Sequence, residues 1–408
     1  MAAFCPVMQF HSEKSDPTPS EERSPWNVQE RTGDTTIVPV FRKYVNTRTN
    51  LLPYIYSESI KSSATGSPMM RAMFLDFADD TNTYNLDQQY MFGHSLLVAP
   101  VMNEGETEKA VYLPEGEWID FWHNALTAGG ETKTYYADAD SIPVYVKNGS
   151  IIPMNLNANY ELGGSIGNDV DNYTNLTFRV YPQGNSSYTV NNSDGTSMEI
   201  QATENFDQHK VTVQLPAYDS QITTQIFGSR PSSVTANGNE LQQVSSLDEF
   251  VAGTDCFFYN ANEKFTYVKS SVKDAVAICV NGISKAPFEA EHAALTGVST
   301  NTNHTGYYGE GFVEQFAENG DAVAFTVYED AEAEKNVVIR YSAGTEDAQR
   351  SISVNGETVR ISLPKTQDWD TWSEISVPIH VVVGRNTINI CYNEGDFSGI
   401  NLDCIRIE

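Results

Sequence analysis

The residues best suited to chemistry near the start of the chain are His11, Arg23 and Trp26. His11 ends an apolar stretch over residues 3–11 that we expect to form a strand, and a polar loop follows over residues 12–33. In a β/α barrel, the end of a strand and the loop behind it form the catalytic face. Histidine forms hydrogen bonds and tryptophan offers a flat ring, so the pattern suits contact with a sugar. A structural loop histidine is the alternative.

Three aspartates in one short segment, Asp76, Asp79 and Asp80, have the composition of a general acid and base. Aspartate is also frequent in turns, where its side chain accepts hydrogen bonds from nearby backbone amides. We therefore assign these three residues to a solvated turn.

The five cysteines show no CxxC spacing and no neighbouring histidine pair, so the sequence predicts no zinc site. An odd and sparse set also argues against a disulfide scaffold. Cys391 and Cys404 flank a short loop, which leaves two readings open: a disulfide between adjacent strands, or two small core residues.

The charge of the chain limits its partners. The formal net charge is −29 over 408 residues, and the whole acidic excess lies in residues 67–408. Such a surface repels phosphate backbones, so we expect no nucleic acid partner, whereas neutral sugars and bound calcium are compatible with it. No segment approaches the roughly 20 apolar residues of a membrane span, so we expect none.

Helical spacing of apolar residues is confined to the first part of the chain. It predicts one long helix over residues 34–66, capped by Asp34 or Thr35, kinked at Pro53 and ended by Gly66. After residue 66 the pattern is that of short strands separated by turn signals such as Asn148-Gly149. The first strand of this series is expected over Met69–Leu75.

Several segments within residues 2–122 resemble glycoside hydrolase family 31, and they occur in the family's order. These segments are AAFCPVMQFHSE, SPWN, KYVNTRTNLLPYIY, GSPMMRAMFLDF, QQYMFGHSLLVAPV and VYLPEGEWIDFW. The resemblance implies that His11 binds the sugar beside the bond to be cut, and that Arg23 and Trp26 lie in the loop behind it. It also implies structural roles for Asp87, Gln88 and Gly93.

Members of that family are retaining enzymes with two catalytic carboxylates about 5–5.5 Å apart. Both carboxylates precede the histidine that matches His11. The resemblance therefore implies that the nucleophile and the acid/base lie upstream of Met1, so no catalytic residue is assigned in this chain. It also implies that the chain is inactive alone and that its partner is a missing N-terminal part of the same polypeptide.

The end of the chain resembles a family 35 carbohydrate-binding module through FEAEHA, GYYGEGF, RISLPKTQDWDTW, GRNTINI and INLDCIRIE. Such modules hold a structural calcium ion against their first and last strands. The matching carboxylates, which are hard oxygen ligands, are Glu289, Glu291 and Asp403; three solvated carboxylates are the alternative. The resemblance implies that sugar contacts come from loops, with one of the two tryptophans in the core, and the candidates are Tyr307, Tyr308, Trp369, Trp372 and Asn393.

We therefore expect a mainly β fold. It consists of the last β/α unit of a TIM barrel, two β-domains and a C-terminal β-sandwich of jelly-roll type. The expected boundaries are 1–85 for the fragment of the (β/α)8 barrel, 86–168 for a proximal β-sandwich, 169–280 for a distal β-domain and 284–408 for the carbohydrate-binding module.

The resemblance implies a secreted parent enzyme that hydrolyses α-glucosides or α-glucan oligosaccharides with retention and needs no cofactor for catalysis. Three alternatives stay open. Two keep the same fold, an α-glucosyltransferase and an α-xylosidase. The third is a carbohydrate-binding protein without chemistry.

Overall fold

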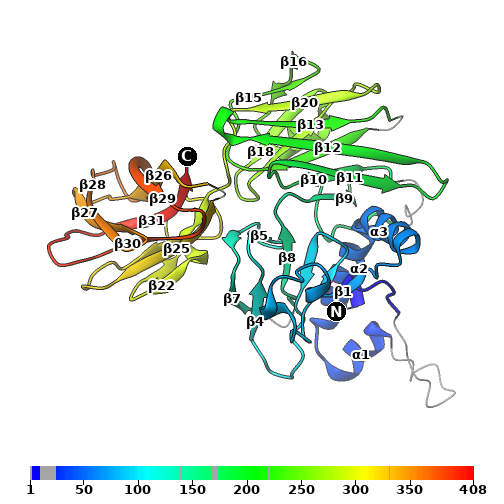
Figure 1. Cartoon of the computed structure of the whole chain (residues 1–408), viewed down its shortest axis with the longest axis horizontal. Coiled ribbons are helices and arrows are strands. Elements are labelled where there is room, and N and C mark those ends of the chain that lie inside the picture. The colour runs from blue at the N-terminus through cyan, green and yellow to red at the C-terminus, as the bar shows by residue number, and fades with distance from the viewer. Residues whose placement is uncertain (1, 10–23, 138–139, 168–172, 219–220, 330) are drawn as a thin grey trace.

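The computed structural model describes residues 2–9, 24–137, 140–167, 173–218, 221–329 and 331–408. It confirms the mainly β prediction. Figure 1 shows helices α1–α3 beside a small proximal β-domain, a large two-sheet distal domain above it, and a terminal sandwich on the other side. None of the helices described is long and apolar enough to cross a membrane.

The predicted single helix is two helices. The helical bounds are α1 (Pro25–Thr32), α2 (Ile37–Asn50), α3 (Leu52–Thr65) and, in the distal domain, α4 (Leu247–Ala252). The break falls at Leu51, with φ −80° and ψ 3°, because Pro53 lies in the first turn of α3 and cannot donate a backbone hydrogen bond. Gly66 ends α3 in the left-handed conformation, as predicted. Thr36, two residues after Asp34, is the N-cap of α2.

The opening strand prediction is wrong for the residues that are described. Ala2–Phe4 form a 3-10 turn, and Val7 is 75% exposed. Phe4 is fully buried with its ring 5.9 Å from that of Phe121. The backbone carbonyls of this segment are bound by Arg48, whose Nη1 lies 3.1 Å from the oxygen of Ala3, instead of by a neighbouring strand. This apolar segment is thus held in place by the packing of the Phe4 ring and by the hydrogen bonds of the Arg48 guanidinium group.

The proximal domain is a six-stranded sheet in the order β1-β2-β3-β8-β5-β6, flanked by the β4-β7 hairpin. The stretch predicted as one strand over Met69–Leu75 is a three-residue strand followed by a 3-10 turn over Met73–Leu75. The strand bounds are β1 (Met70–Ala72), β2 (Tyr90–Phe92), β3 (Leu96–Val98), β4 (Glu108–Leu113), β5 (Glu117–Asp120), β6 (Leu126–Ala128), β7 (Glu131–Tyr136) and β8 (Val144–Lys147).

The distal domain stacks two six-stranded sheets, in the orders β17-β18-β19-β14-β10-β9 and β11-β12-β13-β20-β15-β16. Strand β9 falls within 86–168, yet it pairs antiparallel with β10, so it belongs to a distal sheet. The bounds of the first sheet are β9 (Ile151–Asn155), β10 (Leu176–Val180), β14 (Ile222–Phe227), β17 (Gln242–Gln243), β18 (Cys256–Asn260) and β19 (Phe265–Lys269). Those of the second are β11 (Asn185–Asn191), β12 (Ser197–Asn205), β13 (Lys210–Leu215), β15 (Ser233–Ala236), β16 (Asn239–Glu240) and β20 (Val276–Asn281).

The C-terminal module is an antiparallel sandwich with sheet orders β23-β24-β31-β26-β29 and β22-β25-β30-β27-β28. Its first strand pairs with its last, which brings Glu289 opposite Cys404. The bounds are β21 (Phe288–Glu289), β22 (Ala294–Thr296), β23 (Ser299–Asn301), β24 (Phe312–Glu314), β25 (Ala322–Glu329), β26 (Ala333–Ser342), β27 (Ala348–Val354), β28 (Glu357–Leu363), β29 (Ser373–Val381), β30 (Gly384–Cys391) and β31 (Asn401–Ile407).

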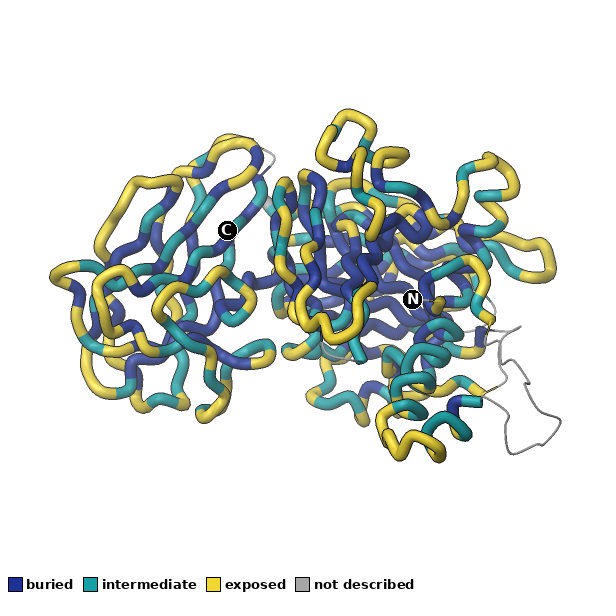
Figure 2. The backbone as a smooth tube through the Cα atoms, turned by 90° about the horizontal axis from the view of Figure 1, so that it is seen from below, coloured by how far each residue is buried: buried dark blue, intermediate teal, exposed yellow. Residues whose placement is uncertain are grey.

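One of the three hydrophobic clusters that the described residues form crosses the proximal domain, the distal domain and the C-terminal module. A continuous set of buried side chains runs from Phe4 through Phe121 and Phe265 to Ile405, and Figure 2 shows the buried strands continuing where the module meets the rest of the chain. The five cysteines are all free, which excludes the disulfide between Cys391 and Cys404.

Candidate functional site

Three positions named in the sequence predictions lie outside the described residues. They are Met1, upstream of which we expect the nucleophile and the acid/base, and the predicted sugar contacts His11 and Arg23. The placement of the two catalytic carboxylates before Met1 therefore stays a prediction, as do the roles of His11 and Arg23.

Trp26, the third predicted sugar contact near the N-terminus, lies in the first turn of α1. Ser24 caps this helix by accepting a 3.2 Å hydrogen bond from the backbone N–H of Asn27. The ring of Trp26 is 61% exposed and contacts Phe41 of α2 at 6.5 Å between ring centroids. It is thus available to a ligand.

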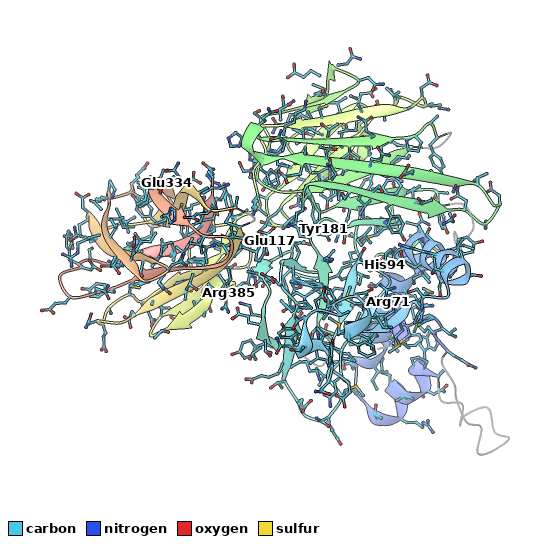
Figure 3. All side chains as sticks on the ribbon, viewed as in Figure 1. Arg71, His94, Glu117, Tyr181, Glu334 and Arg385 are labelled. Atoms are coloured by element: carbon cyan, nitrogen blue, oxygen red, sulfur yellow. The ribbon has the colours of Figure 1, made fainter. Side chains whose placement is uncertain are left out.

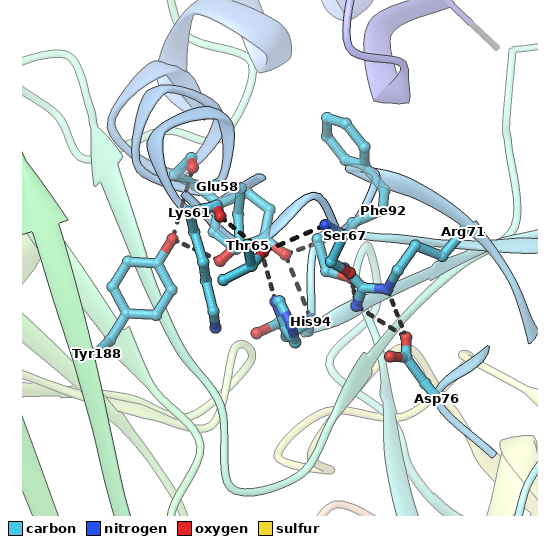
Figure 4. A network of polar contacts seen from close by, with 12 residues as sticks. Glu58, Lys61, Thr65, Ser67, Arg71, Asp76, Phe92, His94 and Tyr188 are labelled. Carbon is cyan, nitrogen blue, oxygen red and sulfur yellow. Dashed lines mark hydrogen bonds and ion pairs between the residues drawn. The ribbon is translucent and has the colours of Figure 1, made fainter. Parts of the chain in front are cut away.

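Arg71 of β1 joins the turn that follows this strand to the backbone of Gly93 (Figure 4). Arg71 is buried, its Nε lies 2.9 Å from Asp76 Oδ2, and its Nη2 donates to the backbone oxygen of Gly93 at 2.7 Å. Asp80 instead accepts a hydrogen bond from the Tyr112 hydroxyl at 2.6 Å. Asp76 and Asp80 therefore have structural partners, in agreement with their assignment to a turn.

A second polar contact joins helix α3 to the proximal and distal sheets in the same view (Figure 4). The buried carboxylate of Glu58 accepts from Tyr188 of β11 at 3.1 Å and contacts His94 Nδ1 at 2.8 Å. Burial works to raise the pKa of Glu58, but the His94 hydrogen bond and charge outweigh it and hold the pKa below its usual value. Figure 3 shows His94 and Arg71 lying together on the helical side of the proximal domain.

The three predicted calcium ligands converge in the module. Glu289 ends β21, Glu291 follows in a 3-10 turn, and Asp403 lies on the adjacent last strand, β31. We call these three residues the carboxylate cluster. The loop over residues 303–311 closes over it: the backbone N–H of Gly311 donates to Glu291 Oε1 at 3.1 Å, and that of Tyr308 donates to Asp403 Oδ1 at 3.0 Å.

The carboxylate cluster is short of hydrogen-bond donors. Among the residues described, neither carboxylate oxygen of Glu289 and only one of Glu291 finds a hydrogen-bond donor. Burial raises the pKa of Glu289; burial and the adjacent Glu289 charge raise that of Glu291 to about 8. Burial likewise raises the pKa of Asp403 to about 7, against the opposing effect of Arg340. Buried carboxylate oxygens that lack hydrogen-bond donors favour a bound cation.

Two protein cations already touch the cluster. Arg340 of β26 forms an ion pair with Asp403 and lies 4.0 Å from the ring of Tyr308. Lys264 Nζ lies 3.0 Å from Glu289 Oε1, an ion-pair contact without hydrogen-bond alignment. Within the described part of the chain, no group of three His, Cys, Asp or Glu side chains is arranged so that it could hold a metal ion. The carboxylate oxygens of the cluster are of the kind that Ca²⁺ prefers as ligands.

The predicted sugar-contacting residues divide into two groups. Trp369 is half-buried; its ring lies 6.2 Å from that of His304 and packs on Gly344, where an added Cβ would be 2.7 Å from the indole Cγ. Asn393 lies in the loop after β30 and donates its backbone N–H to the buried Asp396. These loops meet at one end of the sandwich, so they can form a sugar-binding face.

The other three aromatics lie nearer the carboxylate cluster. Trp372 donates its indole N–H to the oxygen of Thr305 at 2.8 Å and packs against Phe312 and Tyr307. Tyr308 stacks under Arg340, as described above. Neither tryptophan is fully buried, but Trp372 is the one enclosed by neighbouring rings. Sugar contact by any of these residues stays a prediction.

Sequence reasoning missed Lys264, Arg340 and His304. Arg340 is one of the polar residues that alternate with apolar residues along β26, and its spacing from other polar residues is not distinctive. Lys264 belongs to a different domain from the carboxylate that it contacts. No local pattern could have identified either residue, because both contacts depend on how distant segments pack.

Two family descriptions match the start of the chain and one matches its end. Residues 1–58 match the glycosyl hydrolases family 31 TIM-barrel domain, residues 66–152 the glycosyl hydrolase family 31 C-terminal domain, and residues 286–408 carbohydrate binding module family 35. These matches confirm both resemblances.

Among curated relatives, an isomaltosyltransferase of Sporosarcina globispora is 50% identical over 411 residues, which cover 100% of this chain and 38% of the relative. An α-xylosidase of Saccharolobus solfataricus is 34% identical over 49% of this chain and 25% of its own length. Thus the chain spans well under half the length of these relatives.

Among solved structures, a cycloalternan-forming enzyme from Listeria monocytogenes in complex with a pentasaccharide has a TM-score of 0.96 and 47% identity, covering 100% of this chain and 39% of that one. A Listeria monocytogenes EGD-e protein with the same scores was solved with glucose, magnesium and calcium.

Proposed function

Because residues 1–58 and 66–152 belong to glycoside hydrolase family 31, we propose that the whole protein transfers α-linked glucosyl or isomaltosyl units between α-glucan oligosaccharides. In a retaining enzyme, a covalent glycosyl intermediate is released by an incoming hydroxyl group. Water gives hydrolysis and a sugar hydroxyl gives transfer. The proposal selects the α-glucosyltransferase alternative over the hydrolase that the family resemblance alone implies.

This choice rests on how much of the chain each relative matches. Identity to the isomaltosyltransferase is 50% across the whole chain, including the terminal module, whereas the α-xylosidase matches only 49% of it. A module that holds glucan beside the catalytic domain raises the local concentration of acceptor hydroxyls. Such an arrangement favours a sugar over water as acceptor.

The test uses the whole protein and a malto-oligosaccharide whose non-reducing end carries an α-1,6-linked glucose. We expect oligosaccharides larger than the substrate to form faster than free isomaltose or glucose, with the ratio rising as sugar concentration rises. Chromatography of the products over time measures both. Free sugar equal to the substrate consumed at every concentration would overturn the proposal.

For this chain we propose that Trp369 is the stacking platform of the module. Trp369→Ala should weaken binding of α-glucan oligosaccharides by about tenfold or more, equivalent to about 1.4 kcal/mol, because it removes the flat ring of the loop face. Calorimetric titration of the chain measures the change. Tyr136→Ala, which removes an aromatic that is 76% exposed on β7, is the matched control and should have no effect. Equal affinities for Trp369→Ala and the unmodified chain would place the platform elsewhere.

We further propose that the carboxylate cluster binds a structural Ca²⁺. Support comes from its buried oxygens without donors, and from the calcium found in the similar Listeria protein. Glu289, Glu291 and Asp403 would hold the ion, and the bound charge would tie the first and last strands to the loop over residues 303–311. This loop also reaches the sugar face, because the backbone N–H of Thr305 donates to Asp370.

Calcium at about 100 times its dissociation constant should stabilise the fold by about 2.7 kcal/mol. The expected result is a higher melting temperature of the chain in calcium than in EDTA, measured by calorimetry. Glu289→Gln should remove this difference, whereas Glu332→Gln, an exposed carboxylate of the same module, should keep it. Identical melting temperatures in calcium and EDTA for the unmodified chain would exclude the site.

A further inference from the structure

The carboxylate cluster is not enclosed by the module alone. Lys264 enters it from the turn between β18 and β19 of the distal domain, and its side chain is 1% exposed. Besides Glu289, its ammonium group lies 3.4 Å from the backbone oxygen of Asn124 in the proximal domain. One side chain therefore contacts residues of the distal domain, the proximal domain and the C-terminal module.

Lys264 is positioned by backbone contacts of its own domain. Its φ is +58°, and its carbonyl accepts from the N–H of Gly228 at 2.9 Å. A buried ammonium needs a nearby anion. Glu289 is the carboxylate that it contacts, so the pair stabilises the packing of the module on the distal domain.

The same carboxylate serves two cations. We propose that the ammonium group of Lys264 occupies one side of the module's calcium site and competes with calcium for Glu289. Calcium binding and the packing of the C-terminal module on the distal domain, which we call the seating of the module, therefore oppose each other. This inference rests on the calcium site proposed above. A divalent ion bound by Glu289 repels the ammonium 3.0 Å from that residue's Oε1. By linkage, the factor by which the Lys264 contact weakens calcium binding equals the factor by which bound calcium weakens that contact.

Lys285 provides a matched comparison. It also crosses between the module and the proximal domain, with Nζ 3.1 Å from Glu117 Oε1 and 3.6 Å from Glu329 Oε1. Neither carboxylate belongs to the cluster, and Figure 3 places Glu117 where the proximal domain, the distal domain and the module meet. Removal of the Lys285 charge changes the net charge as much as removal of the Lys264 charge does, but it leaves Glu289 with its cation.

The first experiment titrates the intact 408-residue chain with calcium chloride by calorimetry. Lys264→Met should bind calcium at least tenfold more tightly than the unmodified chain. Lys285→Met removes a contact across the same junction but leaves Glu289 with its cation, so its gain in calcium affinity should be smaller than that of Lys264→Met. Equal or weaker binding by Lys264→Met overturns the inference while leaving the calcium site intact. Absence of binding in the unmodified chain and in Lys264→Met overturns both.

The second experiment needs no substitution. Ile283, Ser284 and Ala286, which surround Lys285 in the linker, are buried while the module is seated. Trypsin cleavage after Lys285 should therefore accelerate several-fold when calcium is added to the unmodified chain. If calcium slows this cleavage or leaves its rate unchanged, the opposition between binding and seating does not exist.

Discussion

Replacing Gly93 with alanine should destabilise the chain by more than about 3 kcal/mol, since two penalties act together. Gly93 has φ +63°, a conformation that L side chains rarely adopt. An added Cβ would overlap the hydroxyl of Tyr54 and lie 2.6 Å from its Cζ and 2.9 Å from Glu58 Cγ. Tyr54 is fully buried and donates to the backbone oxygen of Phe92 at 2.7 Å, so it cannot move aside without breaking that bond.

Gly105→Ala is the control for this substitution. Gly105 has φ +78°, and an added Cβ there meets nothing within 4 Å. It should show the backbone penalty alone, about 1 kcal/mol. Urea unfolding followed by tryptophan fluorescence compares the two. If both variants lose the same stability, the close packing of helix α3 on Gly93 contributes nothing.

The second large effect is expected at Arg350, which is fully buried in the module. Its Nη1 donates to the oxygen of Phe397 at 3.0 Å and its Nη2 to that of Ser398 at 2.7 Å, so it supports the loop that follows β30. Burial lowers the pKa of Arg350 to about 10, against the opposing effect of Asp396. Arg350→Met should cost about 3–5 kcal/mol, because the backbone carbonyls of Phe397 and Ser398 lose their charged donor inside the module.

Arg360→Met tests whether burial is the cause. Arg360 lies 3.1 Å from the same Asp396 through its Nε, but its side chain is 46% exposed. The guanidinium of Arg360 is half-exposed, and the buried Asp396 keeps its hydrogen bonds from Ser351 and from the N–H of Asn393, so loss of this pair should cost about 1 kcal/mol. The melting temperature at which the C-terminal module unfolds should therefore fall strongly for Arg350→Met and little for Arg360→Met. A fall of similar size in both would contradict this explanation.

Local backbone conformation was predictable from the sequence at positions where the type of a single residue determines it. Gly66 ends α3 and Asp76 supports a turn, as expected from glycine and aspartate. The single long helix was wrong at Leu51 because proline disrupts the helix in the turn before it, not only at its own position. The opening strand was wrong because apolar residues in an isolated run do not reveal whether a neighbouring strand exists.

The candidate site was predictable to the extent that family motifs name its residues. Glu289, Glu291 and Asp403 do come together, because β21 pairs with β31. The positions of Lys264 and Arg340 were not predictable, since their contacts are made across elements far apart in the chain. The same holds for Tyr308, which lies under Arg340 next to the cluster and not beside Trp369.

Strand β9 has a consequence for the synthesis of this protein. It leaves the ribosome directly after β8, but its sheet is completed only by β10, β14 and β19, the last of which ends at Lys269. At about 5–20 residues per second, this wait is on the order of ten seconds. Its partner β10 follows soon after, but until β14 and β19 are made the β9–β10 pair is a two-stranded ribbon without the rest of its sheet, so the nascent chain exposes apolar residues such as Ile151 and Ile152. We expect a chaperone at the exit tunnel to bind there first.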